Sequence, residues 1–298
     1  MISVCIPVFN VDVRNLAETL KEQSSDLPAE IILIDDGSDK KYRDLNANLQ
    51  NKGIRYYQLE ENIGRSRIRN RFAGYAEYEH LLFLDCDSVV ISDRFLEEYA
   101  KAAVEFPGRL ICGGRIYSPE PPGRNRRLHW KYGIRKESQP VEVRKKDPNR
   151  SFMTNNFLIP IHVLKQIPFD ERLSGYGHED SLFGHELTRQ GYSIVHIDNP
   201  VLHGELEPNR EFLNKTRDAV QNLVLITELL KDDTGFTESI TLLKIVSKLK
   251  SRGLAGLVRM SSMILVPFSR LILFLGFSSL KMLDIYKLGL YLILKRRG

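Results

Sequence analysis

Cysteine and tryptophan are scarce in this sequence, which has three cysteines and one tryptophan in 298 residues. Cys5, Cys86 and Cys112 lie singly in apolar runs. They provide neither a disulfide framework nor the spacing of a thiolate metal site, so we expect a reducing compartment. Residues 1–10 lack a basic stretch followed by an apolar core, so no secretory signal peptide is expected. Repeats and low-complexity tracts are absent as well, and a hydrophobic content of 42% excludes a wholly disordered chain.

The net charge of +5 is unevenly distributed along the chain. Residues 1–214 carry 29 Lys and Arg against 32 Asp and Glu, whereas residues 215–298 carry 14 against 6. A basic tail on a mildly acidic body is typical of a protein that meets a polyanionic surface, either a membrane or a nucleic acid. The length fits two domains, or one α/β enzyme domain with an appendage. We expect a catalytic domain over residues 1–210 and a helical region over 211–298.

Short apolar runs alternate with helix-like segments near the start of the chain. The pattern predicts strands at 2–7, 30–34, 53–59 and 80–84 and helices at 12–24, 39–50 and 64–78. Such alternation is typical of a parallel sheet with helices on both faces, whose ligands bind at the carboxyl ends of the strands. Further on we expect irregular loops with short strands at 107–150, strands at 152–160 and 193–197, helices at 161–167 and 180–190, and helices alone after 208.

The segment LLFLDCDSVV places Asp85 and Asp87 at the end of an apolar strand. Alternation along an extended chain directs both carboxylates to the same side. There they repel each other and are costly to desolvate unless a cation neutralises them. Oxygen ligands of this kind suit Mg²⁺ or Mn²⁺ bound together with substrate phosphates. In the alternative interpretation, the two acids cap a following helix that begins near Ser92.

Two more acidic pairs lie at the ends of predicted elements. Asp35 and Asp36 end the strand in EIILIDDGSD. They form either an Asx turn with a helix cap or a contact with a nucleotide base or ribose. Glu179 and Asp180 lie in GYGHEDSLFGHELTRQG at the start of a predicted helix. There they either stabilise the helix N-terminus or include a general base.

Histidines near these acids are further candidates. His203 follows the strand at 193–197 and the turn Asn199-Pro200, and His196 within that strand is its rival. A lone histidine is more often part of a core or surface than a ligand. His178 and His185 flank the third acidic pair and are expected to shape it.

Taken together in this order, the motifs resemble those of family 2 glycosyltransferases with the GT-A fold. The matching segments are SVCIPVFN (3–10), IDDGS (34–38), NIGRSRIRN (62–70), LDCD (84–87), FDERLSG (169–175), GHED (177–180) and residues 191–203. The resemblance covers residues 1–205 and implies an α/β fold with a Rossmann-like mixed sheet and helices on both faces. The Gly-x-Gly-x-Glu-Asp form is most similar to bacterial members that transfer galactose or N-acetylgalactosamine. Ser174 stands where those members carry an aromatic residue.

The resemblance implies a role for each matching residue. It implies that Asp87, Asp85 and His203 hold a divalent ion, Mn²⁺ or Mg²⁺. It also implies that Asp180 is the catalytic base and that Glu179 beside it holds the acceptor. The implied donor-binding residues are Pro7, Asp35, Asp36, Asn62, Arg65 and Asp85.

The reaction that the resemblance implies agrees with these residue types. A nucleoside diphosphate leaves with growing negative charge, which a divalent ion stabilises. A carboxylate on the opposite face takes the proton from the acceptor hydroxyl as it attacks. One displacement inverts the anomeric centre without a protein nucleophile. The sequence has no Gly-x-Ser-x-Gly motif, and Cys86 is interpreted as part of a strand.

Residues 239–298 are both basic and apolar, with 11 Lys and Arg and one acid. The 21 residues between Arg259 and Lys281 are long enough to span a bilayer. Arg270 would be costly at mid-membrane, and Pro267 interrupts the helix. On one continuous helix the charges from Arg259 onward form a single stripe, as in helices that lie in a membrane interface. The alternative is a helical subdomain packed on the catalytic body, or an oligomer interface.

The sequence therefore predicts a cytoplasmic glycosyltransferase, peripheral on the inner face of the membrane. It would move a sugar from a nucleotide-sugar donor, expected to be UDP-linked, to a glycan or lipid-linked acceptor. A nucleotidyltransferase is disfavoured because VFNVDVRN, after the first strand, lacks a Gly-rich basic loop. The other alternative is a membrane-associated nucleotide-sugar-binding or scaffold protein with an inactive site. No nucleic-acid partner is expected, because the basic residues of the tail alternate with Leu and Ile instead of aromatic residues.

Overall fold

The computed structural model of the chain describes residues 1–25, 27–231 and 233–295. It contains two compact units. Unit 1 comprises Met1–Ser118, Glu137–Arg172 and Glu179–Glu205. Unit 2 comprises Pro119–Lys136, Leu173–His178 and Leu206–Gly298. The predicted domain boundary after residue 210 stays a prediction. Unit 1 ends at Glu205, and two earlier stretches, Pro119–Lys136 and Leu173–His178, belong to the helical unit.

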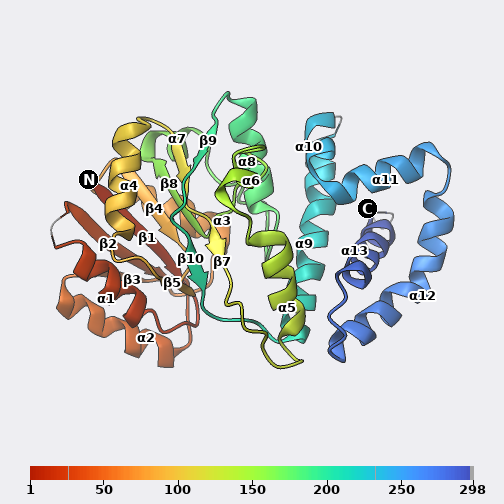
Figure 1. Cartoon of the computed structure of the whole chain (residues 1–298), viewed down its shortest axis with the longest axis horizontal. Coiled ribbons are helices and arrows are strands. Elements are labelled where there is room, and N and C mark those ends of the chain that lie inside the picture. The colour runs from red at the N-terminus through yellow and green to blue at the C-terminus, as the bar shows by residue number, and fades with distance from the viewer. Residues whose placement is uncertain (26, 232, 296–298) are drawn as a thin grey trace. The chain divides into compact units, whose positions relative to one another are not determined.

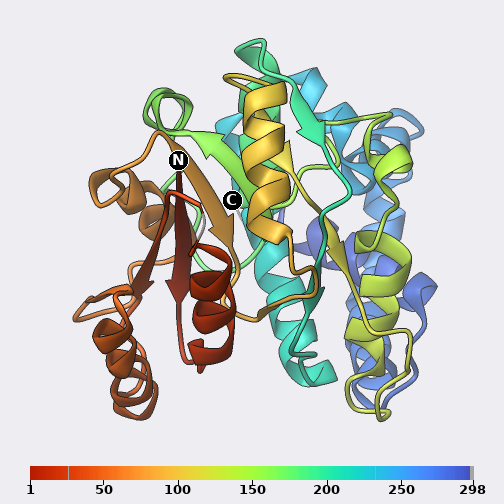
Figure 2. The same cartoon turned by 60° about the vertical axis from the view of Figure 1, so that its left-hand side comes forward.

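Unit 1 is an α/β unit in which most strands are followed by a helix (Figures 1 and 2). Its elements are β1 (Ile2–Val8), α1 (Arg14–Gln23), β2 (Ala29–Asp35), α2 (Lys40–Ala47), η1 (Asn48–Lys52), β3 (Arg55–Gln58), α3 (Arg65–Arg71), η2 (Phe72–Gly74), β4 (His80–Leu84), β5 (Ser88–Val90), α4 (Phe95–Glu105), β6 (Leu110–Cys112), β7 (Arg115–Ile116), α6 (Val141–Arg144), β8 (Asn156–Pro160), α7 (Ile161–Gln166), α8 (Glu179–Arg189), β9 (Ile194–His196) and β10 (Val201–His203).

The main sheet has seven strands in the order β3-β2-β1-β4-β8-β6-β9. The first four strands along the chain run parallel, as predicted, and β8 runs antiparallel to both of its neighbours. The sheet is therefore mixed. A smaller sheet, β5-β10-β7, holds the strands that follow β4, β9 and β6 along the chain. Because β1, β2 and β4 are parallel neighbours, their carboxyl ends meet at one edge.

Helices cover both faces of the main sheet, as predicted. On one face, the even-numbered residues of β1 pack with α1 and α4 around Leu20 and Tyr99. On the other face, α3, α7 and α8 pack around Phe83 and Phe157. The helix predicted at 64–78 is shorter than expected: α3 ends at Arg71 and continues as the 3-10 turn η2, a common way for an α-helix to end.

Unit 2 is helical, in agreement with the prediction for residues after 208. Its elements are α5 (Arg127–Tyr132), most of the π-helical turn η3 (Gly133–Glu137), α9 (Asn209–Leu229), α10 (Thr234–Ser239), α11 (Thr241–Ser251), α12 (Ala255–Phe274) and α13 (Leu280–Leu294). Segment 173–178 packs on α9, where Asn222 donates to the carbonyl of Gly177 at 3.0 Å. In the part of the chain that the structure describes, α12 is the one helix long and apolar enough to cross a membrane.

The expected single stripe of charge along a continuous C-terminal helix is wrong. The helical conformation ends between α12 and α13, where Gly276 has a φ of 95°. Ser279 then caps α13 by accepting from the Met282 N–H at 3.3 Å. A left-handed glycine ends the first helix and a serine cap starts the next, so the two helices fold back on each other.

Candidate active site

The carboxyl end of β4 positions Asp85 and Asp87. Asp85 follows directly after β4, and its N–H donates to the Asn155 carbonyl at 3.1 Å, which extends the pairing with β8. The Ser88 N–H then donates to the Asp85 carbonyl at 3.0 Å, so residues 85–88 form a tight turn. The next helix, α4, begins only at Phe95, after strand β5. The two acids are therefore not caps of that helix, which was the alternative to a functional role.

Three arginines surround the Asp85 carboxylate. Arg69 Nη2 lies 3.1 Å and Arg65 Nη2 3.8 Å from Oδ1. Arg115 Nη2 lies 2.9 Å from Oδ2. Burial alone raises the pKa of Asp85, but the charges of Arg65, Arg69 and Arg115 outweigh it and leave the pKa below its ordinary value. Asp85 is thus a partly buried carboxylate that stays ionised.

The first turn of α8 joins this cluster. Glu179 is buried, and its Oε1 lies 3.1 Å from Arg65 Nε and 3.8 Å from Arg69 Nη1. The same two arginines therefore connect Glu179 with Asp85. Arg69 itself is buried and also lies over the Phe169 ring at 5.7 Å. Its Nη1 also donates to the Arg65 carbonyl at 3.4 Å. A buried charge of this kind depends on such partners, above all on the two carboxylates.

Asp180 follows Glu179 and is partly buried. Burial, together with the charge of Glu179, raises the pKa of Asp180 to about 6. The N–H of Ser181 donates to Asp180 Oδ1 at 2.7 Å, and the Ser181 hydroxyl lies 3.3 Å away. A carboxylate with a pKa close to neutral is suited to general-base chemistry.

Asp87 lies beside His203 on the smaller sheet. His203 Nδ1 is 3.4 Å from Asp87 Oδ2, and β10 brings His203 opposite Ser88 of β5. The Gly204 N–H donates to the Asp87 carbonyl at 2.8 Å, which fixes the backbone of the pair. The Tyr117 ring lies 5.0 Å from the His203 ring. The Tyr117 hydroxyl donates to Glu137, which also pairs with Arg115.

Asp35 and Asp36 shape the neighbouring edge of the sheet. Asp35 is fully buried, accepts from the Ser38 N–H at 2.7 Å and from the Tyr56 hydroxyl at 2.9 Å, and so forms the predicted turn. Asp36 Oδ1 accepts from the Ile63 N–H at 2.7 Å, and Oδ2 accepts from the Gly64 N–H at 3.1 Å. Asp36 therefore ties the end of β2 to the residues that lead into α3. Donor contacts for both acids stay predictions.

Pro7 and Asn62 lie at the same edge. Pro7 is half-buried near the end of β1 and pairs in register with Ile34 of β2. Asn62 is exposed in the loop that Asp36 anchors. Gly37, at a φ of 74°, packs on this loop so closely that a Cβ there would lie 2.7 Å from the Asn62 backbone nitrogen.

Asp87 and His203 are the pair that would hold a divalent ion. Within residues 1–25, 27–231 and 233–295, no group of three His, Cys, Asp or Glu side chains is arranged as a metal site. Both Asp85 oxygens lie against arginines. A carboxylate and an imidazole suit Mn²⁺ or Mg²⁺ when phosphate oxygens and water complete the shell. The donor set fits an ion bound jointly with a diphosphate, and Asp85 as a third ligand stays a prediction.

His196 has a structural place instead. Its Nδ1 lies 2.7 Å from Arg144 Nη1 and its Nε2 lies 2.8 Å from the Pro148 carbonyl. Burial lowers the pKa of His196 to about 4, so the imidazole is neutral. Arg144 also donates to the carbonyls of Gly113 and Ile197 and holds these segments together.

Sequence reasoning missed Arg69, Arg115, Tyr117 and Glu137. A signal for Arg69 was present, because Arg65 and Arg69 are four residues apart and share one face of a helix. Arg115, Tyr117 and Glu137 reach Asp85 and His203 through tertiary contacts between segments that carry no periodic pattern.

Comparison with known proteins agrees with this architecture. Residues 3–162 match the family described as Glycosyl transferase family 2. The chain is 26% identical to hyaluronan synthase of Pasteurella multocida over 239 residues. This alignment covers 69% of the chain and 24% of that protein. It is 31% identical over 129 residues to poly(ribitol-phosphate) β-N-acetylglucosaminyltransferase TarP of Staphylococcus aureus (strain N315), 42% of this chain and 38% of that protein.

Solved structures show the same fold at low identity. The mannosyltransferase PcManGT from Pyrobaculum calidifontis, in complex with GDP-Man and Mn²⁺, superimposes with a TM-score of 0.63 at 12% identity. That match covers 99% of this chain and 86% of the other. Glucosyl-3-phosphoglycerate synthase from Mycobacterium tuberculosis, in complex with Mn²⁺, UDP and glucosyl-3-phosphoglycerate, has a TM-score of 0.53 at 18% identity. That match covers 76% of this chain and 79% of the other.

The mixed sheet, its two helical layers and the acids at the strand ends define a protein of the GT-A glycosyltransferase fold. The family match covers more than half of the chain, so the chain belongs to glycosyl transferase family 2. The chain spans only 24% and 38% of the two curated relatives.

Proposed function

We propose that the protein is an inverting glycosyltransferase that uses a nucleotide-sugar donor, most simply a UDP-sugar, and a divalent metal ion. The observation that carries the proposal is the linkage of the acids through one short helix. Asp36 binds the N–H of Gly64, and Arg65, the next residue, pairs with both Asp85 and Glu179. The predicted donor-binding acids and the acid next to the predicted base therefore meet at the start of α3.

In the proposed reaction, Asp180 accepts the proton of the acceptor hydroxyl. Glu179, fixed by Arg65 and Arg69, orients the acceptor beside it. Inversion follows because a base on the acceptor side supports a single displacement. The pKa of about 6 keeps Asp180 ionised at neutral pH while leaving it more basic than an ordinary carboxylate.

On the donor side, Asp87 and His203 would hold the metal ion, which supplies positive charge to the diphosphate. Arg65 and Arg115 offer further guanidinium groups next to Asp85, where phosphate oxygens are suitable acceptors. The nucleoside is proposed to bind at the sheet edge formed by Pro7, Asp36 and Asn62, with the buried Asp35 supporting this edge through its turn.

We further propose that the acceptor is a glycan or lipid-linked saccharide and that the protein works at the inner face of the membrane. The basic, apolar C-terminal helices support this location. The relatives named above include a synthase of hyaluronan and a transferase acting on poly(ribitol-phosphate), which supports a polysaccharide acceptor.

A panel of nucleotide sugars tests the proposal, with release of UDP or GDP as the readout and Mn²⁺ or Mg²⁺ supplied. We expect metal-dependent release with at least one donor, and loss of that release in Asp180→Asn. Binding of UDP with metal but no turnover of any donor would instead support the inactive binding protein.

A further inference from the structure

Helix α12 buries small polar residues and exposes large apolar ones, the reverse of a helix in a water-soluble bundle. Its buried residues are Ser262, Ser269 and Leu273. Its large apolar side chains are exposed, with Leu257 at 69% and Ile264 at 76%. The other exposed apolar residues of this helix are Met260, Met263, Leu265, Phe268, Leu271 and Phe274. A soluble amphipathic helix buries its apolar face and exposes its polar one.

The buried face of α12 is a contact of small residues with α13. A Cβ at Gly289 of α13 would lie 2.7 Å from Val266 Cγ2 and 2.9 Å from Ser262 Cβ. The Ser262 hydroxyl donates to the Val258 carbonyl at 2.7 Å, so it is satisfied within its own helix. Close approach through glycine and serine is typical of helices that pack in a lipid environment.

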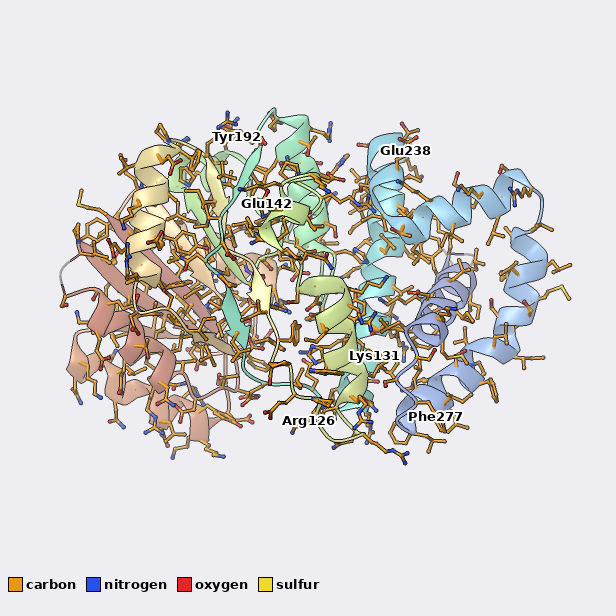
Figure 3. The ribbon with its side chains drawn as sticks, viewed as in Figure 1. Arg126, Lys131, Glu142, Tyr192, Glu238 and Phe277 are labelled. Atoms are coloured by element: carbon orange, nitrogen blue, oxygen red, sulfur yellow. The ribbon has the colours of Figure 1, made fainter. Side chains whose placement is uncertain are left out.

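The exposed face is one continuous surface. Leu257, Ile264 and Leu271 are seven residues apart, so they follow one line along the helix, opposite Ser262 and Ser269. Phe277, in the turn after α12, is 66% exposed and lies at this end of the α12–α13 hairpin (Figure 3). A contiguous apolar surface of this kind marks a site of interaction with a protein or a membrane.

The charge of the helices next to α12 favours an anionic membrane over a second copy of the chain. Exposed lysines and arginine lie on α11 and just after it, at Lys244, Lys248, Lys250 and Arg252. Between residues 239 and 295 the sequence has nine Lys and Arg and only Asp284 as an acid. A second copy would bring the same positive charge, whereas anionic headgroups complement it.

The contacts that α12 and α13 make with α9 favour an α12 that lies in the membrane interface over an α12 that crosses the bilayer. On its other side α13 contacts α9, where the Tyr291 hydroxyl is 3.1 Å from the Thr227 hydroxyl and Lys295 Nζ is 3.5 Å from Glu228. Arg270 of α12 donates to Asn214 of α9 at 3.3 Å. Spanning would strip these polar groups of their partners in hydrocarbon.

We propose that α12 docks the protein on anionic bilayers. The helix lies parallel to the surface, with Leu257, Ile264 and Leu271 in the outer acyl region and the basic residues of α11 at the headgroups. This extends the membrane location proposed above and is independent of the transfer chemistry.

Vesicle flotation of the full chain tests the proposal. We expect binding to phosphatidylcholine vesicles with 25% phosphatidylglycerol, weaker binding to phosphatidylcholine alone, and at least a tenfold loss in Ile264→Gln/Leu271→Gln. Both positions are exposed, so the fold tolerates the change. Val104→Gln is the matched control, because Val104 is an 83% exposed apolar residue of α4 in unit 1, and it should bind like the wild type.

The depth of single α12 side chains in the bilayer distinguishes a helix that lies in the interface from one that crosses the membrane. Tryptophan placed singly at Leu257, Ile264 or Leu271, in a Trp130→Phe background, should be quenched by brominated lipids at one shared shallow depth. A spanning helix would instead show depths that differ by about 10 Å from one position to the next.

Three results would overturn the proposal: graded depths, no binding to anionic vesicles, or self-association through α12 seen by light scattering and abolished by Ile264→Gln/Leu271→Gln. Turnover of a soluble acceptor, measured in parallel, keeps the two proposals apart. A double variant that has lost vesicle binding but retains turnover supports both.

Discussion

Replacing Asp180 by Asn separates its proposed role as a base from any role in folding. The change keeps the size of the side chain and removes its charge and basicity. General-base catalysis contributes about 10²–10⁴-fold to a rate, so we expect transfer to fall by that factor. Donor binding should change little, because Arg65, Asp85 and the Asp87–His203 pair remain in place.

The same substitution has a predictable effect on stability. The pKa of Asp180 is about 6 in the folded protein against an ordinary 3.8, so the folded state binds a proton more tightly than the unfolded state between these pH values. The full difference corresponds to about 3 kcal/mol, and solvent screening at this partly exposed group reduces it to about 1 kcal/mol. Stability is therefore lost as pH rises from 4 to 6. At pH 7.5 Asp180→Asn should be at least as stable as the wild type.

The assays are donor turnover against pH and urea unfolding at two pH values. The wild type should lose kcat/KM below about pH 6 in a single-proton step. Glu186→Gln is the matched control, since Glu186 lies on the same helix and pairs with Arg189 at 3.1 Å. An Asp180→Asn variant that retains more than a tenth of wild-type turnover, or a profile without the acidic limb, would refute the assignment of Asp180 as the base.

Three further changes test the rest of the site. Asp87→Asn should abolish the increase in UDP affinity that Mn²⁺ gives, measured by calorimetry with and without chelator; an unchanged metal effect would exclude Asp87 as a ligand. Asp85→Asn should lower the free energy of unfolding by about 2 kcal/mol, because three guanidinium groups lose the partly buried carboxylate that they share. Asp12→Asn, which breaks an exposed pair, should cost less than about 0.5 kcal/mol, and equal losses would contradict this reasoning. Gly37→Ala should cost more than about 2 kcal/mol and weaken UDP binding, since its Cβ would lie 2.6 Å from the Glu61 backbone. Gly53→Ala has the same sign of φ, but its Cβ would only touch the end of the Lys21 side chain at 3.8 Å, so it should cost about 1 kcal/mol and leave binding intact.

The elements that position the site were predictable because each is a short apolar run ended by polar residues. Strand β4 has its predicted bounds, His80–Leu84, and Glu179 and Asp180 lie in the first turn of their helix. A strand that is buried on both faces of a sheet has a continuous apolar run in its sequence, so the sequence pattern identifies it directly. The antiparallel direction of β8 was not predictable, because an apolar run has no direction.

Contacts between distant segments were not predictable from pattern. Arg115 and Glu137 are 22 residues apart in sequence. They meet beside Asp85 only because tertiary folding brings β7 next to the last residue of η3. The inverted packing of α12 was also hidden. Periodicity identifies which residues share a face of a helix, but it does not say which face the neighbouring helix covers. The break at Gly276, which ended the predicted single stripe, shows the same limit.

The seven residues of α3 connect parts of the protein that an engineer would wish to alter separately. Asp36 binds the loop before this helix. The first and fifth residues of the helix, Arg65 and Arg69, pair with Asp85 and Glu179. A library that randomises residues 62–64 to accept a new sugar nucleotide would also shift Glu179, the residue proposed to orient the acceptor. Donor and acceptor preferences are therefore expected to change together, and retargeting should succeed more often when both ends are diversified in the same round.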